Sequence, residues 1–376
     1  MSREAPFSFY EFFAGGGMAR IGLGASWACR FAHDDDEPRA QAYRENFGAQ
    51  DFRLADVWDL TAADLPGRAD LVWTSSPCQD LGLAGARGLQ DQRSAAFWGF
   101  WRLIEQLDGE GRAPRAVGVE HALGLLTSHG GADFNALCAA LADRGYGFGA
   151  LEIDAALFLP QARPRLFLLA VRSPGRDVLA GGPGGFHTPA ILRAFERLPP
   201  GLKDRWLWWR VPPPARCNAA LADVLEPDDA VPWLSPARAA RLVSLMADVH
   251  KTKLDLALQP GGRAIGAAFR RTWTEAGRRM QRTEARFDGL AGRLRASTGG
   301  SSRQFVLVAE DGKLRARFLA PREAARLMGL PEDYRLPIAA RAALRLAGDG
   351  VAAPVVRHLA AHVLEPLLAG AAKAAA

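Results

Sequence analysis

The chain has 376 residues, of which 49% are hydrophobic, so it is long enough to bury a large core in one or two domains. It has no run of about 20 apolar residues that would span a membrane, and its first residues lack the apolar stretch of a signal peptide. Cys29, Cys78, Cys138 and Cys217 are widely spaced, which argues against a disulfide framework or a zinc site and fits a reducing cytoplasm.

The net charge of +6 is concentrated in one segment. Residues 261–317 contain 13 Lys and Arg against 5 Asp and Glu, a balance of +8, and the rest of the chain sums to −2. A near-neutral body with one basic segment indicates that a polyanion binds at one place. A solvated arginine-rich surface would give the same composition, so this alternative stays open on charge alone.

A glycine-rich turn joins the first predicted strand to the first predicted helix. Residues 7–13 form the apolar run of a buried strand, three glycines follow Ala14, and residues 18–27 have the apolar pattern of a helix. In nucleotide-binding α/β folds, such a turn lets a ligand approach the backbone at a helix N-terminus. The turn alone is a weak signal.

Acidic residues follow the second predicted strand at residues 28–32. His33 is followed by Asp34 and by two further aspartates. In such folds an acid at this point hydrogen-bonds the diol of a bound ribose. Three consecutive acids are equally typical of a helix N-terminus, where the helix dipole favours negative charge.

A cysteine follows the predicted strand at residues 70–73. The chain runs on into the segment SSPCQ, which contains Cys78, and then into a glycine-rich stretch. A cysteine just past a strand end and under a flexible loop is in position to act as a nucleophile. The alternative is a cysteine that simply packs in the core, because free cysteine is among the most buried residue types.

The next elements continue the alternation of strands and helices. Helices are predicted at residues 94–107 and 133–144, and strands at 115–119, 148–154 and 166–171. Polar residues accompany these strand ends, as in Glu120-His121 and the segment QARPR. Parallel strands with crossover helices satisfy this pattern, so we predict an α/β fold with its polar strand ends at one sheet edge.

The alternation ends near residue 173. Residues 173–216 are rich in Gly, Pro and Trp without a clear period, and the basic segment follows them. We therefore predict a change of domain at residue 173. Helices are predicted again at residues 321–328 and 351–368.

Short motifs follow one another in a set order from Phe9 to about Leu368. They are EFFAGGG, the acidic end of the second strand, Asp56-Val57, SSPCQ with its glycine-rich loop, Glu120, QARPR, a variable region, GGSSRQ, PREAARLMGLP and GDGV. Each motif is weak alone. The ordered set resembles the bacterial DNA (cytosine-5) methyltransferase family.

The resemblance implies S-adenosylmethionine as the methyl donor, bound by a Rossmann-like sheet. It implies that Asp34 holds the ribose, that Asp56 holds the adenine amine, and that Asp349 returns beside the cofactor. The other implied cofactor-binding residues are Phe13, Ala14, Gly15, Gly17, Val57 and Pro77.

The resemblance also implies two domains. Residues 1–172 with 318–376 would form a discontinuous catalytic domain, and residues 173–317 a smaller, irregular target-recognition domain. The implied partner is double-stranded DNA, bound by a monomer without a metal. Arginines of the second domain would contact phosphates and guanine edges. The candidates are Arg263, Arg270, Arg271, Arg278, Arg279 and Arg303.

The implied reaction explains why these residue types are needed. Cys78 as a thiolate would add to C6 of cytosine and make C5 electron-rich. Glu120 would hydrogen-bond the N3/N4 edge of the ring, and Arg163 and Arg165 would hold the ring carbonyl or a flanking phosphate. A stacked base cannot reach a thiol, so the target must be flipped out of the duplex.

The sequence departs from the family pattern at two points. His121 stands where the family usually has Asn, and Gly82 stands where it usually has Ser. These changes are compatible with ordinary drift, with an altered donor such as carboxy-S-adenosylmethionine, or with a catalytically impaired DNA-binding homologue. A tRNA cytosine methyltransferase of the same fold is a further alternative, but the Cys-Phe-Thr signature of that branch is absent.

Overall fold

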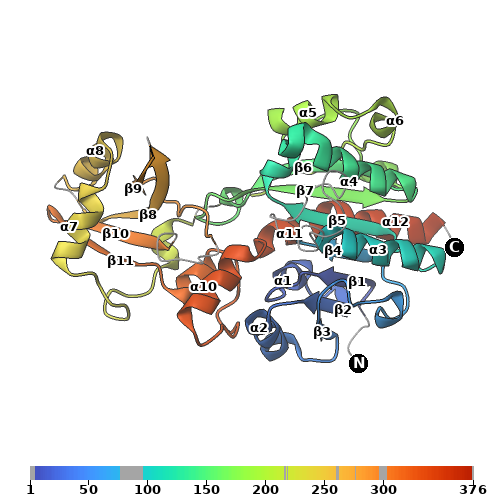
Figure 1. Cartoon of the computed structure of the whole chain (residues 1–376), viewed down its shortest axis with the longest axis horizontal. Helices are drawn as coiled ribbons and strands as arrows, with labels where there is room; N and C mark the ends of the chain where they lie inside the picture. The colour runs from blue at the N-terminus through green and yellow to red at the C-terminus, as the bar shows by residue number, and fades with distance from the viewer. Residues whose placement is uncertain are drawn as a thin grey trace. The chain divides into compact units, whose positions relative to one another are not determined.

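A computed structural model describes residues 5–76, 96–215, 217, 219–259, 262–275, 277–295 and 303–374. The chain packs as two compact units, which are drawn in Figure 1. Unit 1 comprises residues 1–154, 164–214 and 351–376, and unit 2 comprises residues 155–163 and 215–350. The candidate catalytic Cys78 and the neighbouring Pro77 lie outside the described residues.

Unit 1 is built on a seven-stranded sheet with the order β3-β2-β1-β4-β5-β7-β6. The first five strands in this order, β3, β2, β1, β4 and β5, are parallel to one another, and β7 is antiparallel to both β5 and β6. The predicted α/β class is confirmed. The strands are β1 Phe7–Phe12, β2 Trp27–Asp34, β3 Phe52–Leu54, β4 Leu71–Thr74, β5 Ala116–His121, β6 Gly147–Asp154 and β7 Pro164–Val171.

Helices of unit 1 bury apolar side chains against this sheet. Helix α3 places Phe97, Phe100 and Ile104 in one core with Phe12 and Val72 of the strands. Burying a large apolar side chain stabilises the fold by about 1.5–3 kcal/mol. The helices are α1 Met18–Leu23, α2 Glu37–Phe47, α3 Ala96–Gly109, α4 Ala132–Asp143, α5 Pro189–Glu196, α6 Pro200–Lys203, α11 Ala353–Leu359 and α12 Glu365–Ala374.

The tryptophan-rich segment belongs to unit 1, so the packing boundary predicted at residue 173 lies instead at residue 215. The indole of Trp209 donates a hydrogen bond of 2.9 Å to the Gly149 carbonyl on β6. The ring of Trp206 lies 6.0 Å from that of Phe148, also on β6. These side chains cover the end strand of the sheet. The second boundary, predicted at residue 318, lies between residues 350 and 351.

Unit 2 contains a four-stranded antiparallel sheet with the order β11-β10-β8-β9, and it is more regular than predicted. Its small core includes Leu242, Met246, Leu254, Phe305 and Leu307. The strands are β8 Ala264–Glu275, β9 Arg278–Arg286, β10 Gln304–Glu310 and β11 Lys313–Phe318. The helices are α7 Pro236–Ser244, α8 Asp248–Ala257, α9 Pro321–Arg326 and α10 Ala340–Asp349.

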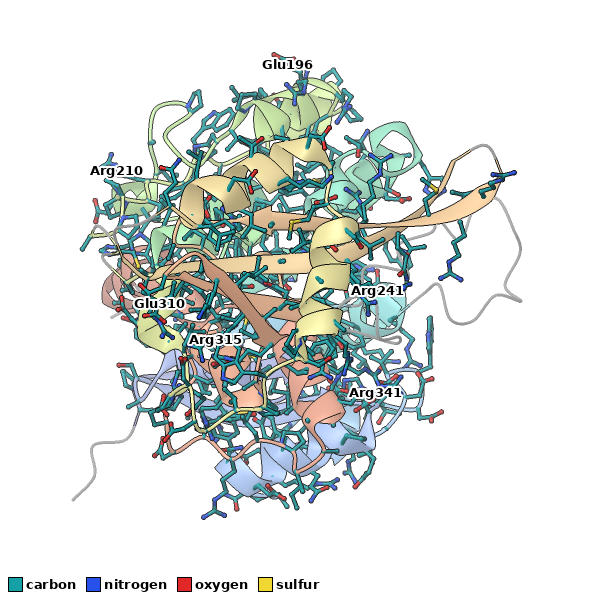
Figure 2. The ribbon with its side chains drawn as sticks, turned by 90° about the vertical axis from the view of Figure 1, so that its left-hand side faces the viewer. Glu196, Arg210, Arg241, Glu310, Arg315 and Arg341 are labelled. Atoms are coloured by element: carbon teal, nitrogen blue, oxygen red, sulfur yellow. The ribbon has the colours of Figure 1, made fainter. Side chains whose placement is uncertain are left out.

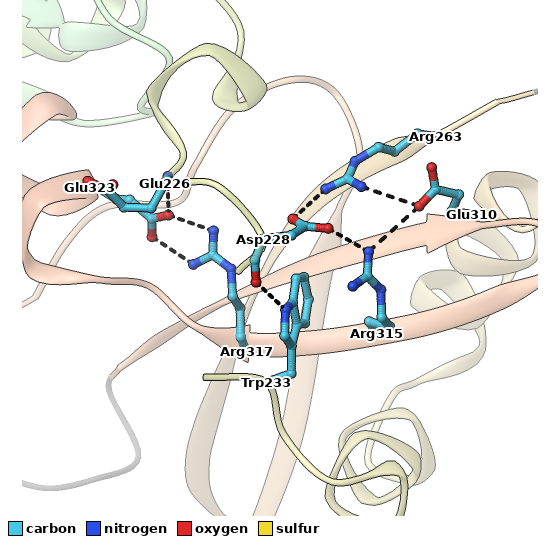
Figure 3. A network of polar contacts seen from close by, with 8 residues as sticks. All are labelled: Glu226, Asp228, Trp233, Arg263, Glu310, Arg315, Arg317 and Glu323. Atoms are coloured by element: carbon cyan, nitrogen blue, oxygen red, sulfur yellow. Dashed lines mark hydrogen bonds and ion pairs between the residues drawn. The ribbon is translucent and has the colours of Figure 1, made fainter. Parts of the chain in front are cut away.

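A fully buried ion pair ties β11 to α9 in unit 2. Arg317 donates two hydrogen bonds to Glu323, of 2.9 and 2.6 Å, and both side chains are shielded from solvent. Glu323 also accepts hydrogen bonds from the amides of Ala320 and Glu226. Figure 3 shows this pair beside a second, more exposed network around Asp228. Both carboxylate oxygens are satisfied, which a buried charge requires.

One helical stretch, residues 340–370, is long and apolar enough to cross a membrane by length and composition. In the structure, 61% of its most apolar window is buried inside the protein. Burial of that extent is typical of a core helix.

Candidate active site

The carboxyl ends of four parallel strands meet at one edge of the unit 1 sheet. Phe12 of β1 is level with His33 of β2 and with Thr74 of β4, and Thr74 is level with Val119 of β5. Residues that are level on neighbouring strands share a face of the sheet, so His33 and Thr74 lie on the same face as Phe12. His121 lies on this face too, because it is two residues beyond Val119.

The glycine turn after β1 has a constrained backbone. Gly15 and Gly17 have positive φ values of 56° and 75°, and Phe13 has a φ of 54°, which is uncommon for a residue with a side chain. A Cβ at Gly17 would lie 2.4 Å from the ring of Phe47. The amide of Ala14 donates to the carbonyl of His33 at 2.8 Å. The turn is therefore held close to the end of β2.

Asp34 connects the end of β2 to this turn. Its buried carboxylate accepts hydrogen bonds from the amides of Gly15 at 2.8 Å and Asp36 at 3.0 Å, and Arg39 lies 3.5 Å away. Burial raises the pKa of Asp34, and Arg39 partly opposes that rise. One carboxylate thus positions the turn and keeps an acidic group at the site.

Asp56 and Val57 follow β3 with opposite exposures. Asp56 is exposed and accepts a hydrogen bond of 2.9 Å from the Trp58 amide. Val57 is buried, and a Cβ at Gly99 of α3 would lie 2.7 Å from its Cγ1. The structure therefore provides an exposed acceptor next to an apolar surface.

Glu120 and Arg165 form a largely buried ion pair between β5 and β7. The Arg165 Nε lies 2.9 Å from Glu120 Oε1, and their side chains are 12% and 8% exposed. The two groups are close, but Oε1 lacks the alignment of a hydrogen bond. The pair gives a carboxylate with one oxygen still able to accept a donor. This ion pair brings together two of the residues predicted to be catalytic, Glu120 and Arg165.

His121 is buried beside this pair and is held in one tautomer. Its Nδ1 lies 3.1 Å from the Ala122 carbonyl, which can only accept, so Nδ1 carries the hydrogen and Nε2 is a bare acceptor. Burial lowers the pKa of His121, the carbonyl and Glu120 oppose that shift, and the charge of Arg165 adds to it. The imidazole is therefore neutral at neutral pH.

Several buried polar atoms at this sheet edge have no hydrogen-bond partner within the part of the chain that the structure describes. Buried polar groups normally pair, so each of these atoms needs a further partner, which a ligand can supply. Sequence reasoning missed His33 and Thr74, whose signal was a polar residue at the end of an apolar strand. The atoms are Glu11 Oε2, His33 Nδ1, Thr74 Oγ1, Ser76 Oγ and His121 Nε2.

Glu11 lies on β1 under the turn, and its ionisation is coupled to stability. Burial raises its pKa from an ordinary value of 4.5 to about 8. The positive charge of Arg20 opposes this rise, and the negative charge of Asp34 adds to it. The folded protein thus keeps a proton that the unfolded chain releases between pH 4.5 and 8, so Glu11 costs stability as pH rises.

We expect Glu11→Gln to become more stable relative to the wild type from pH 5 to 8. Urea unfolding at four pH values measures this, and a difference that stays constant with pH would contradict it.

Arg163 and Asp349 belong to unit 2, whereas Glu120 and Arg165 belong to unit 1. The buried guanidinium of Arg163 donates to the carbonyls of Leu294 at 3.1 Å, Gly348 at 3.1 Å and Gly350 at 2.6 Å. Asp349 ends α10 with its carboxylate 3.7 Å from Arg345. The contacts of Arg163 favour a role in holding the backbone of unit 2. Its predicted catalytic role and the predicted cofactor contact of Asp349 stay predictions.

The six arginines predicted to bind DNA have different surroundings in unit 2. Arg263 pairs with Asp228 at 2.7 Å, and Arg303 lies over the ring of Phe318 at 4.0 Å. Arg270 lies over the ring of Phe305, and Arg271 is 3.5 Å from Glu284. Exposed positions on β9 are occupied by Arg278 and Arg279.

Among the described residues, no group of three His, Cys, Asp or Glu could hold a metal ion.

Comparisons with known proteins give a consistent result. A family model described as C-5 cytosine-specific DNA methylase matches residues 7–227 and 239–365. The type II methyltransferase M.HhaI of Haemophilus parahaemolyticus is 23% identical over 358 residues, which cover 94% of this chain and 93% of that protein. M.BsuFI of Bacillus subtilis is 24% identical over 386 residues, covering 98% of this chain and 75% of that protein.

Two solved structures are similar to this chain in fold. The Dnmt2 methyltransferase of S. pombe has a TM-score of 0.62 and 16% identity, covering 96% of this chain and 99% of that one. The methyltransferase EhMeth of Entamoeba histolytica has a TM-score of 0.63 and 12% identity, covering 96% and 98%.

Proposed function

The chain belongs to the C-5 cytosine-specific DNA methylase family, and we propose on this basis that it methylates carbon 5 of cytosine in duplex DNA. The observation that carries the proposal is the buried Glu120–Arg165 pair at the sheet edge where the glycine turn and Asp34 meet. A buried carboxylate with an unused acceptor suits a planar ring that offers an amine and a ring nitrogen.

The same edge fits S-adenosylmethionine. Asp34 would accept from the ribose, Asp56 from the adenine amine, and the turn at Gly15 and Gly17 would allow close approach to the backbone. The unpartnered polar atoms nearby, among them those of His33 and Thr74, support a ligand at this place. When bound, this cofactor supplies an electrophilic methyl group on a sulfonium.

Three side chains would do the work on the base. The Cys78 thiol would give up its proton to a base or to water, and its sulfur would bond to C6 as the C5–C6 π bond opens, which places electron density on C5. Glu120 hydrogen-bonds the N3/N4 edge and stabilises that adduct, while Arg165 orients Glu120 and limits its freedom. Loss of the C5 proton to a base or to water would then re-form the C5–C6 double bond, break the C6–S bond and regenerate the thiolate of Cys78.

The test compares nucleosides from cells that express the wild type or Cys78→Ser. We expect 5-methylcytosine in DNA from the first and none above background in the second, measured by mass spectrometry. RNA from the same cells is the control for substrate class and should be unchanged. A heavier C5 adduct would instead indicate an altered donor, and unmodified cytosine with intact DNA binding would indicate a non-catalytic homologue.

A further inference from the structure

His33 lies near the end of β2, at the edge of the unit 1 sheet, and its side chain is fully buried. Its Nε2 lies 3.0 Å from the carbonyl of Ala55, which can only accept, so Nε2 carries the hydrogen. Burial lowers the pKa of His33 to about 4. The carbonyl of Ala55 and the charges of Asp35 and Asp56 oppose that shift. The imidazole is therefore a neutral donor to the chain that follows β3.

This hydrogen bond holds the backbone directly before Asp56. Leu54 of β3 is level with Asp34 of β2, and the amide of Ala55 donates to the Asp34 carbonyl at 3.2 Å. Ala55 is thus held at its amide and at its carbonyl by two successive residues of β2. The exposed Asp56 comes next in the chain, so the position of its carboxylate depends on the contact between His33 and Ala55.

The same imidazole contacts the glycine turn after β1. The ring of Phe13 lies 5.4 Å from the ring of His33 at an interplanar angle of 79°, which is an edge-to-face arrangement. Phe13 has a φ of 54°, a backbone conformation that is costly for a residue with a side chain. The amide of Ala14 donates to the His33 carbonyl at 2.8 Å. His33 therefore holds the start of the turn through its ring and through its backbone.

We propose that His33 is a positioning residue that gives the donor site its selectivity for adenine. This rests on the proposed function, with Asp56 accepting from the adenine amine and Phe13 lining the same site. The hydrogen bond to Ala55 fixes Asp56, and the ring contact fixes Phe13. A misplaced carboxylate loses a directional hydrogen bond to the amine, whereas a displaced ring loses apolar contact with any purine. The two contacts of His33 therefore have separable effects.

Three variants of the purified full-length protein separate these effects. His33→Gln keeps an N–H at the reach of Nε2 but loses the aromatic ring. His33→Phe keeps an aromatic ring but loses the N–H. In His33→Asn the amide is one bond closer to the backbone, so this variant loses both contacts.

The matched control is His250→Asn, which makes the same chemical change outside unit 1. His250 is a half-buried histidine of unit 2 whose Nδ1 lies 3.0 Å from the Ala285 carbonyl. It belongs to α8, the helix that follows α7 in the chain, and Arg241 of α7 is labelled in Figure 2.

Calorimetry measures the binding of S-adenosylhomocysteine and of S-inosylhomocysteine, in which a carbonyl replaces the purine amine. The ratio of the two affinities reports the selectivity for the amine. Unfolded protein in a sample lowers the binding stoichiometry and leaves this ratio unchanged. The methylation rate is measured on the same proteins over a range of S-adenosylmethionine concentrations, because a positioning residue of the donor site should change KM for the donor and leave kcat nearly unchanged.

We expect the wild type to prefer the adenine compound, and His33→Phe and His33→Asn to lose about 3- to 15-fold of that preference, which is the size of one hydrogen bond. His33→Gln should keep the preference while binding both compounds more weakly. The control should bind both compounds as the wild type does.

Equal weakening toward both compounds in all three variants would overturn the proposal and leave His33 a purely structural residue. A loss of preference in His33→Gln as large as in His33→Phe would overturn it too, because the N–H that contacts Ala55 would then not be the cause. Unchanged binding in every variant would also contradict it. A wild type that binds neither compound would instead refute the proposed cofactor site.

Discussion

Glu120→Gln should lower the methylation rate by about 10²- to 10⁴-fold, measured under conditions in which the variant is folded. Glutamine keeps the size of the side chain but cannot exchange a proton with the ring, and it leaves Arg165 without its 2.9 Å counter-ion. The effect belongs to the chemical step, so kcat should fall and cofactor affinity should change little. Single-turnover transfer from a radiolabelled methyl donor to DNA measures it.

The control for this variant is Glu105→Gln. Glu105 is a half-exposed acid on α3 that pairs with Arg144 at 2.9 Å, so the same chemical change is made at a surface ion pair. Surface pairs contribute about 0–1 kcal/mol, so the control should retain its rate and its stability. A Glu120→Gln protein that keeps more than a third of the wild-type rate would show that Glu120 only positions Arg165.

Glu323→Ala should destabilise unit 2 by about 3–5 kcal/mol, because it leaves the buried guanidinium of Arg317 without a counter-charge. The cost comes from the stranded charge more than from the lost hydrogen bonds. Hydrogen exchange of peptides from β10 and β11 reports on unit 2 itself, and these peptides should exchange faster than in the wild type.

A double variant separates the stranded charge from the loss of packing. Arg317→Met with Glu323→Leu removes both charges and keeps apolar volume, so it should recover much of the lost protection. If the double variant exchanged as fast as Glu323→Ala, the carboxylate would matter through its amide contacts with Ala320 and Glu226 instead.

The strand ends were predictable from the sequence because a polar residue after an apolar run is a local signal. The turn at Gly15 to Gly17, the acid at Asp34 and the pair Glu120-His121 are all visible in this way. The Glu120–Arg165 contact follows from antiparallel pairing of β5 with β7, which a prediction of parallel strands does not give. His33 contacts the carbonyl of Ala55, 22 residues away in sequence, through its Nε2. Its Nδ1 is therefore the ring nitrogen left without a partner among the described residues.

The packing boundary was mispredicted because proline and glycine hide the period of a segment that packs by individual side chains. Trp206 and Trp209 attach to β6 through ring contacts and one hydrogen bond, not through a repeating pattern. The roles of the arginines were equally hidden. Asp228 and Arg315 are 87 residues apart in sequence, and composition alone cannot tell an internal brace from an exposed cation.

The last segment of unit 1, residues 351–376, is synthesised after unit 2, and this order affects folding on the ribosome. A Cβ at Gly22 of α1 would lie 2.5 Å from Val356 of α11, so the two helices fit face to face although about 330 residues separate them. At about 5–20 residues per second, α11 is made roughly 15–70 s after α1. During that interval α1, which begins directly after the glycine turn, lacks its packing partner α11, so unit 1 completes its packing only after unit 2 has been translated.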